Sequence, residues 1–375
     1  MIQNAFKGLK LSALGLGCMR FPVIDGDHGK IDIDAVRELL ATAMDGGVNY
    51  YDTAYGYHNG QSETVMGELL SAYPRDSFYL ADKFPGYDRG NFDKYEEIFE
   101  DQLKKCRVDY FDFYLCHTVC ESNIDLYIEY APRLKAYLLE QKKNGRIRHI
   151  GFSNHGSLET TERFLAAYGD CMEFCQIQLN WLDWTVQNAK AMVQLLRERH
   201  LPIWVMEPVR GGKLATLSPE YEERLRALRP DATAAEWAFR YLQTFPDVVV
   251  TLSGMSNLAQ LNENIATFET AKPLTDDETA ALLAVADDMI AQNFLLCTGC
   301  RYCTSYCPME LDIPSLIDGY NEYKCFGGFS VPMAIEALPE NKRPSACLGC
   351  RACEAVCPQT IRISEMMRDF TERLA

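Results

Sequence analysis

The sequence has no long hydrophobic segment and no excess of positive charge. No run of about 18 apolar residues occurs in the 375 residues, which excludes a membrane-spanning helix. The opening residues MIQNAFKGLK contain no apolar signal core, so we expect no secretion. The formal net charge of −16 disfavours nucleic acid and anionic membrane surfaces as partners. These absences predict a soluble, cytoplasmic protein, and the acidic charge leaves room for a basic redox partner protein.

A G-x-G-x-x-G motif, the fingerprint of open doubly wound sheets that bind dinucleotides, is also missing. The first two-thirds of the chain nevertheless alternates short apolar strands with amphipathic helices. Eight such pairs over roughly 270 residues match the length of a (β/α)8 TIM barrel of the α/β class. The expected strands are Leu14–Gly17, Val48–Asp52, Phe78–Asp82, Asp112–Cys116, His149–Phe152, Phe174–Gln178, Ile203–Met206 and Val248–Leu252. The expected helices are Asp34–Asp45, Ser62–Leu70, Asp93–Lys105, Tyr127–Asn144, Leu158–Tyr168, Val186–Arg199, Ala234–Thr244 and Asn257–Phe268.

The composition changes abruptly after a further expected helix, Asp276–Gln292. Cysteine, proline and glycine then become frequent, so we expect a domain boundary near Asn293. This boundary divides the chain into a barrel domain, residues 1–292, and a small C-terminal domain, residues 293–375. Within the small domain, we expect Gly327–Pro344 to be a loop-rich spacer.

Eight of the fifteen cysteines form two sets with identical spacing. The spacing Cys-x2-Cys-x2-Cys-x3-Cys-Pro is the signature of bacterial ferredoxins with two [4Fe–4S] clusters, in which the fourth cysteine of each set ligates the other cluster. The sequence therefore predicts a ferredoxin-like iron–sulfur domain. One cluster would use Cys297, Cys300, Cys303 and Cys357, and the other would use Cys347, Cys350, Cys353 and Cys307.

Zinc is the alternative for these cysteines. A zinc site takes two Cys-x-x-Cys pairs, so the third and fourth cysteines of each set would have no use. The remaining seven cysteines are scattered, and we expect them to be ordinary buried thiols. They are Cys18, Cys106, Cys116, Cys120, Cys171, Cys175 and Cys325.

Chemically suggestive residues follow three consecutive strands of the expected barrel, at the end where barrels build active sites. Asp52 ends the second expected strand and Tyr57 comes five residues later, Lys83 follows the third strand and His117 follows the fourth. This order resembles the aldo-keto reductase superfamily. The resemblance implies reduction of a carbonyl to an alcohol, with Asp52, Tyr57, Lys83 and His117 as the catalytic residues.

The chemistry of carbonyl reduction fits these four residue types. Adding a hydride leaves an alkoxide, which must be protonated as it forms. Tyr57 would supply the proton, and we expect the Lys83 ammonium to lower the ordinary tyrosine pKa of about 10 by about one to three units. Asp52 would keep Lys83 charged, and His117 would orient the carbonyl oxygen.

The resemblance extends to segments that imply a nicotinamide cofactor. GRIRHIGFSN and CQIQLN resemble the family's carboxamide-binding segments, which implies contacts from Ser153, Asn154 and Gln176. MEPVRGGKL and LSGMSNLAQLNEN resemble the segments around the pyrophosphate and adenosine. They supply the candidates Met206, Pro208, Arg210, Gly211, Lys213, Ser253, Gly254, Ser256, Asn257 and Asn264. Helix capping is an alternative role for Ser253, Ser256 and Asn257.

Two features depart from the family pattern. Met206 occupies a position where many members stack an aromatic ring on the nicotinamide. In addition, no lysine or arginine occurs between Arg240 and Lys272, where a cation would meet the 2′-phosphate of NADP. The resemblance to the family favours NADP(H) as the cofactor, and the absence of this cation leaves NAD(H) as an alternative.

A reductase barrel followed by this cysteine-rich tail resembles a bacterial subgroup of aldo-keto reductases. We expect an NAD(P)H-dependent enzyme that reduces a small aldehyde or ketone, with the clusters in a supporting role. One alternative is an electron-transfer protein that passes electrons between nicotinamide and an external partner. No flavin-binding signature is visible to split the electron pair of a hydride. The other alternative is a nicotinamide or redox sensor.

Overall fold

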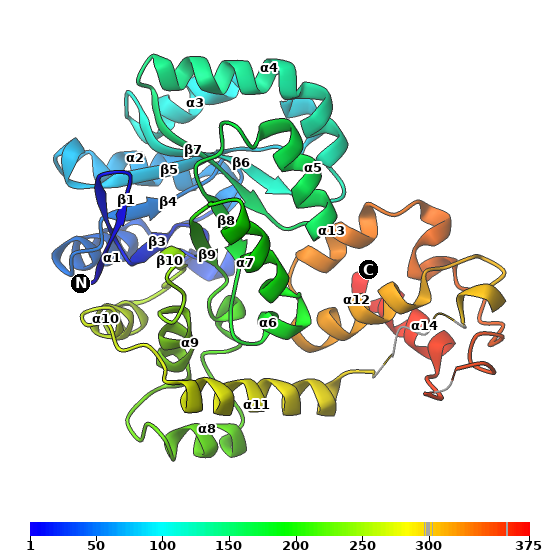
Figure 1. The fold of residues 1–375 in the computed structure, drawn as a ribbon. Coiled ribbons are helices and arrows are strands. Elements are labelled where there is room, and N and C mark those ends of the chain that lie inside the picture. Colours follow the sequence, from blue (N-terminus) through cyan, green and yellow to red (C-terminus); the bar gives the residue numbers. More distant parts are fainter. Residues whose placement is uncertain (296, 298–300, 302, 358) are drawn as a thin grey trace. The chain divides into compact units, whose positions relative to one another are not determined.

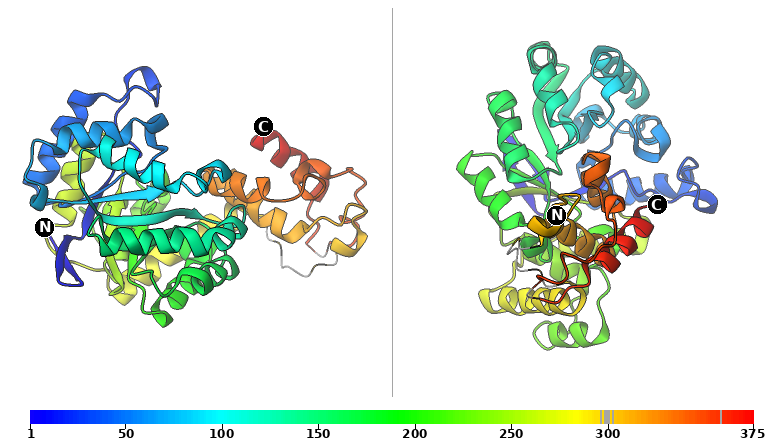
Figure 2. Two further views of the ribbon diagram at one scale, coloured as in Figure 1. Left: turned by 90° about the horizontal axis from the view of Figure 1, so that it is seen from above. Right: turned by 90° about the vertical axis from the view of Figure 1, so that its right-hand side faces the viewer.

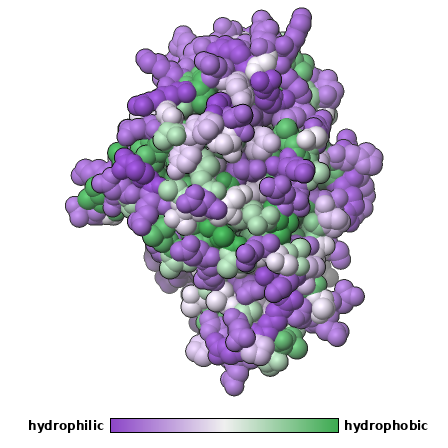
Figure 3. Space-filling model, turned by 90° about the vertical axis from the view of Figure 1, so that its left-hand side faces the viewer, coloured by the Kyte–Doolittle hydropathy of each residue, from purple (hydrophilic) through white to green (hydrophobic). Residues whose placement is uncertain are grey.

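The structure is a computed structural model, and it describes residues 1–295, 297, 301, 303–357 and 359–375. The chain divides into two compact units, Met1–Ala280 and Ala281–Ala375 (Figure 1). Among the described helices, none is long and apolar enough to span a bilayer. Hydrophilic residues cover most of the face in Figure 3, with smaller hydrophobic groups between them.

The first unit contains a closed barrel of eight parallel strands in the order β10-β3-β4-β5-β6-β7-β8-β9. This closure confirms the expected TIM barrel and excludes the open doubly wound sheet. The strands are β3 (Leu14–Gly17), β4 (Tyr50–Asp52), β5 (Tyr79–Phe84), β6 (Phe111–Val119), β7 (Ile147–Asn154), β8 (Cys175–Gln178), β9 (Ile203–Met206) and β10 (Val248–Ser253).

Helices surround these strands (Figures 1 and 2). Their stripes of buried apolar residues, such as Val36, Leu39, Leu40 and Ala43 of α1, match the helical period that the sequence shows. The helices of this unit are α1 (Ile33–Asp45), α2 (Ser62–Leu70), α3 (Tyr95–Cys106), α4 (Ile124–Lys143), α5 (Leu158–Tyr168), α6 (Asp183–Val186), α7 (Ala189–Glu198), α8 (Pro219–Arg226), α9 (Ala234–Leu242) and α10 (Leu258–Thr267).

A hairpin that the sequence did not predict precedes the barrel. Its strands, β1 (Gln3–Phe6) and β2 (Leu9–Ser12), pair antiparallel. Phe6 is buried in the same hydrophobic cluster as Trp204 and Val249, which lie near the first residues of their strands. The hairpin therefore covers the end of the barrel at which the strands begin, and the opposite end is left for the site.

Two expected site residues lie inside strands and not just after them. Lys83 is in β5, where it pairs with Leu115 of β6, and His117 is in β6. The register between β6 and β7 shifts between Cys116 and Val119, which allows β6 to continue past the expected end of the strand.

The helix α11 (Asp276–Asn293) begins in the first unit and ends in the second. The second unit also contains α12 (Ile313–Phe326), α13 (Ser330–Glu336) and α14 (Ile363–Leu374). Its core includes Ile317, Ile363 and Phe370. The segment Gly327–Pro344 includes α13, so the expectation of a spacer made of loops is wrong there: Val331 and Ile335 supply a buried helical face.

Candidate active site

The ammonium of Lys83 lies at the centre of the expected catalytic residues. It donates to Asp52 Oδ1 at 2.6 Å, to the backbone oxygen of Thr53 at 2.6 Å and to the Tyr57 hydroxyl at 3.3 Å. The Lys83 side chain is fully buried, so water cannot compete for these contacts. The structure therefore brings Asp52, Tyr57 and Lys83 together as the sequence predicts.

The surroundings set the protonation of this group. Burial lowers the pKa of Lys83, but Asp52 and Tyr57 outweigh it, and the net pKa is raised. Burial also raises the pKa of Tyr57 to about 12, against the opposing effect of Lys83. The expected net lowering of the Tyr57 pKa is wrong because burial outweighs the ammonium. Lys83 thus stays charged, and Tyr57 keeps its proton at neutral pH.

His117 completes the set from the neighbouring strand. Its ring meets the Tyr57 ring edge-on with a centroid distance of 5.9 Å, and the Tyr87 ring at 5.6 Å. Burial, followed by the Lys83 charge, lowers the pKa of His117 well below its ordinary value, so the imidazole is neutral. The Tyr127 hydroxyl donates to the His117 backbone oxygen at 2.8 Å, and it would clash with any Cβ at Gly86.

Sequence reasoning missed a buried polar cluster that contacts the backbone of Lys83. The side-chain amide of Gln102 donates to the Lys83 backbone oxygen at 2.9 Å, and to Glu63 and Asp82 at 3.0 Å each. Its carbonyl oxygen accepts from the Tyr114 hydroxyl at 2.6 Å. Burial raises the pKa of both carboxyl groups. The helical period of α3 can indicate whether Gln102 is on the buried face of the helix. It cannot indicate which residues the Gln102 side chain contacts.

The three expected carboxamide contacts lie on adjacent strands. Ser153 and Asn154 end β7, and Gln176 pairs with Ser153 from β8. Within the described part of the chain, Asn154 Oδ1 and Gln176 Oε1 are buried and have no hydrogen-bond partner. An unpaired buried oxygen is costly, so these two acceptors suit a ligand that donates N–H groups. A carboxamide is such a ligand.

A cleft of about 720 Å³ opens beside Tyr57. It is lined by the chain segments that follow β3, β9 and β10 and by residues of α9 and α10. Six of the expected cofactor residues line the cleft. Two of them are joined by a hydrogen bond, which the Asn264 side chain donates to Ser253 Oγ at 3.2 Å. The six are Pro208, Gly211, Ser253, Gly254, Ser256 and Asn264.

The other expected cofactor residues take different positions. Arg210 is buried against Asp183, with its Nη2 at 2.6 Å from the carboxylate. Lys213 is exposed, and Asn257 caps α10 by accepting from the Gln260 backbone N–H at 3.0 Å. Met206 is half-buried at the end of β9. None of these four lines the cleft as the described residues define it.

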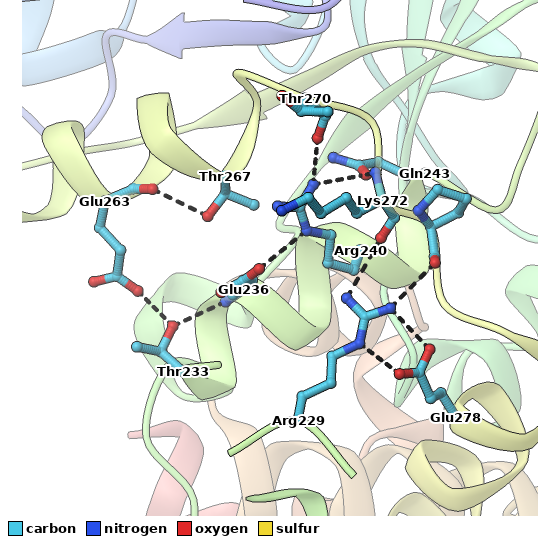
Figure 4. A network of polar contacts seen from close by, with 11 residues as sticks. Arg229, Thr233, Glu236, Arg240, Gln243, Glu263, Thr267, Thr270, Lys272 and Glu278 are labelled. Carbon is cyan, nitrogen blue, oxygen red and sulfur yellow. Dashed lines mark hydrogen bonds and ion pairs between the residues drawn. The ribbon is translucent and has the colours of Figure 1, made fainter. Parts of the chain in front are cut away.

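One acidic side chain, Glu263, lines the cleft beside the start of α9. Thr233 caps α9 and donates to the Glu263 carboxylate (Figure 4). Both residues line the cleft. The nearby Arg240 is buried and donates to Glu236 at 3.1 Å and to the Thr270 backbone oxygen at 2.7 Å. The Arg240 guanidinium is therefore already paired with groups of the protein.

In the second unit, the backbone around the two cysteine sets repeats at positions 50 residues apart. Arg301 and Arg351 both have a φ of 61°, and Glu310 and Thr360 have φ values of 51° and 52°. Left-handed residues turn the chain sharply. At these two pairs of described positions, the sequence repeat is therefore accompanied by the same backbone conformation.

Cysteines from both sets line one small pocket: Cys307 of the first set with Cys347, Cys350 and Cys353 of the second. Cys297, Cys303 and Cys357 pack against the unit's hydrophobic core, and Cys300 lies outside the described residues. Among described residues, no three His, Cys, Asp or Glu side chains are placed to hold a single metal ion. Four thiols around a common pocket suit a larger group, such as a cluster.

Comparison with known proteins covers both units. The model of the Aldo/keto reductase family matches residues 13–287, and that of the 4Fe-4S dicluster domain matches residues 296–361. The chain is 25% identical over 304 residues to the uncharacterized oxidoreductase YqkF of Bacillus subtilis, which covers 73% of this chain and 92% of that protein. It is 25% identical over 301 residues to the NADH-specific methylglyoxal reductase of Escherichia coli, covering 69% of this chain and 90% of that protein.

Solved structures show the same fold. The holo form of an aldo-keto reductase from Bacillus halodurans has a TM-score of 0.59 at 25% identity, covering 74% of this chain and 93% of that one. An aldo/keto reductase from Klebsiella pneumoniae in complex with NADP and acetate has a TM-score of 0.61 at 19% identity, covering 75% and 93%. The family match spans the whole barrel. The chain therefore belongs to the aldo/keto reductase family of oxidoreductases and has a 4Fe-4S dicluster domain at its C-terminal end.

Proposed function

We propose that this protein reduces a small aldehyde or ketone to an alcohol with NADPH or NADH, and that Tyr57 donates the proton. The observation that carries the proposal is the buried Lys83 ammonium, which contacts both Asp52 and the Tyr57 hydroxyl. A carbonyl oxygen that gains negative charge needs a proton donor at hydrogen-bond distance. Tyr57 is such a donor, and its pKa of about 12 keeps it protonated until the reaction.

Each of the other groups has a role in the proton transfer. As the Tyr57 oxygen loses its proton, the Lys83 charge stabilises the phenolate that forms. Asp52 holds Lys83 in place and keeps it protonated. The neutral His117 ring can donate a hydrogen bond to the carbonyl oxygen and set its direction, and Tyr87 lies beside it as a wall for the substrate.

The residues present fit a nicotinamide. Its carboxamide would donate to Asn154 Oδ1 and Gln176 Oε1, the two unpaired buried acceptors, beside Ser153. The nicotinamide supplies the hydride when bound. NADP is bound in the relative from Klebsiella pneumoniae, and the Escherichia coli relative is named NADH-specific. We leave both dinucleotides as candidates.

We further propose that the C-terminal domain, residues 293–375, holds two [4Fe–4S] clusters through the crossed sets given above. The pocket shared by Cys307, Cys347, Cys350 and Cys353 supports the crossing. Every group proposed for hydride and proton transfer precedes Asn264, whereas the first cluster ligand is Cys297. We therefore give the clusters a supporting role and not a place in the electron path.

An anaerobic assay of the purified protein tests the proposal. NADPH or NADH, mixed with a panel of carbonyl compounds, should be oxidised in a one-to-one ratio with alcohol formed, while the cluster spectrum stays unchanged. Tyr57→Phe should lower kcat by about 10²–10⁴-fold, the usual worth of proton donation, and leave dinucleotide binding intact. Reduction of the clusters during turnover would instead favour electron transfer, and full activity of the variant would refute the role of Tyr57.

A further inference from the structure

Arg20, in the segment that follows β3, lines the cleft beside Tyr57. The Arg20 guanidinium pairs with Glu207, with Nη2 at 3.1 Å from Oε1. A Cβ added at Gly211 would lie 2.9 Å from Arg20 Nη2, and one added at Gly254 would lie 3.0 Å from Arg20 Cβ. Arg20 thus lies against the segments after β9 and β10, and its backbone oxygen accepts from Ser256 Oγ at 2.8 Å.

The charge of Arg20 indicates which part of a dinucleotide would meet this arginine. Arg20 lines the same cleft as Tyr57 and contacts Gly211 and Gly254, in the segments that follow β9 and β10. The negative charge common to NADPH and NADH is on the pyrophosphate, and an arginine can bind phosphate oxygens through two parallel hydrogen bonds.

We propose that Arg20 binds the pyrophosphate of the cofactor and that Glu207 occupies the guanidinium until the cofactor arrives. This inference rests on the proposed use of a nicotinamide dinucleotide. Among the described residues that line the cleft, Arg20 is the one with a permanent positive charge, and Glu207 and Glu263 are negative. When the cofactor binds, its phosphates would replace the Glu207 carboxylate as the ion-pair partner of Arg20.

The Arg20 side chain can make this exchange because it is 44% exposed and its pair with Glu207 is on the surface. Exposed ion pairs are weak and are easily replaced by a better partner. The exchange also explains how a cleft with acidic residues binds an anionic cofactor. Since the pyrophosphate is common to both cofactors, Arg20 should serve NADPH and NADH alike.

Dissociation constants of NADH and NADPH, measured by titration of the anaerobic holoprotein, test this proposal. Arg20→Ala should weaken the binding of both dinucleotides to a similar extent, by about ten- to a hundredfold, the usual worth of a charge-assisted hydrogen bond. Arg20→Lys should lose less, because it keeps the charge but not the paired geometry. Glu207→Gln should tighten both dinucleotides, since it removes the competing carboxylate.

Arg37→Ala is the matched control: Arg37 is 54% exposed and pairs with Asp34 on α1. It should leave both constants unchanged. Wild-type affinity in Arg20→Ala would overturn the proposal, and so would a loss confined to NADPH, which would place the guanidinium at the 2′-phosphate. Weaker binding in Glu207→Gln would refute the exchange. If the wild-type protein bound neither dinucleotide, the proposed function itself would fail, and this inference with it.

Discussion

The backbone N–H of Phe21 donates to Nε2 of His58, 3.1 Å away. The other ring nitrogen, Nδ1, lies 3.1 Å from the backbone oxygen of His28, to which it can only donate. Both contacts therefore require the neutral imidazole. A proton on Nε2 would break the contact with Phe21, the residue after Arg20.

This contact predicts a loss of stability in mild acid. Burial lowers the pKa of His58 below its ordinary 6.5. A depressed pKa gives stability that is fully present above about pH 6.5 and is lost as the pH falls through the folded-state value. His58→Asn should remove this part of the pH dependence. Tryptophan fluorescence can follow unfolding of the barrel unit between pH 7.5 and 5, because all four tryptophans lie there.

The control for this prediction is His200→Asn. His200 is exposed and has a φ of 56°, close to the 52° of His58, so both replacements meet the same backbone conformation. If the two variants showed the same pH dependence as the wild-type protein, His58 would not be the group that titrates.

The pair between Asp52 and Lys83 should matter for stability as well as for catalysis. Asp52→Asn removes the charge that balances a fully buried ammonium, and breaking such a pair costs about 3–5 kcal/mol of unfolding free energy. Asp34→Asn is the control, because the Asp34 carboxylate is 92% exposed and should contribute under about 1 kcal/mol. Equal denaturation midpoints for the two variants would contradict the prediction.

Gln102 should act on catalysis through Lys83. Gln102→Leu keeps an apolar stem but leaves the buried Glu63 and Asp82 carboxyl groups without their shared donor, which should cost about 2–5 kcal/mol. It should also lower kcat with little change in KM, since the Lys83 backbone loses its support. Gln194→Leu, at an exposed position on α7, should change neither quantity. An unchanged kcat in a folded Gln102→Leu variant would refute the positioning role.

The crossed cluster ligands can be tested by counting iron. The wild-type protein should contain about eight iron and eight sulfide ions per chain. Cys307→Ser combined with Cys347→Ser should lose one cluster, whereas Cys307→Ser combined with Cys297→Ser should lose both. The opposite pattern would assign Cys307 to its sequence neighbours, and zinc with negligible sulfide would exclude clusters. Cys325→Ser, outside both sets, should keep the full content.

The sequence predicted the barrel because its signal is local. Each strand and helix shows its own period, and the expected site residues lie near the C-terminal ends of neighbouring strands, so the sequence predicts that Asp52 and Lys83 lie close together. Contacts between distant residues carry no such signal. Arg20 and Glu207 are 187 residues apart, and the pairing of Gln102 with Glu63 depends on how α2 and α3 pack.

The one incorrect electrostatic expectation has the same origin. The sequence shows that Lys83 is a cation near Tyr57, which lowers the tyrosine pKa. It does not show how completely the barrel encloses the hydroxyl, and this burial decides the net direction. The hairpin β1–β2 was missed because its first strand, QNAF, shows no alternation of polar and apolar residues, and LKLS alone is too short to indicate a hairpin.

The burial of Lys83 also has a chemical consequence for the proposed reduction of carbonyl compounds. A lysine amine condenses with aldehydes to form an imine, but only when its nitrogen has a free electron pair. The Asp52 carboxylate and the raised pKa keep that nitrogen protonated, and the fold leaves it no exposed surface. Borohydride trapping in the presence of an aldehyde should therefore modify surface lysines and spare Lys83. In the proposed mechanism, Lys83 can therefore stabilise the Tyr57 phenolate without itself reacting with the carbonyl substrate.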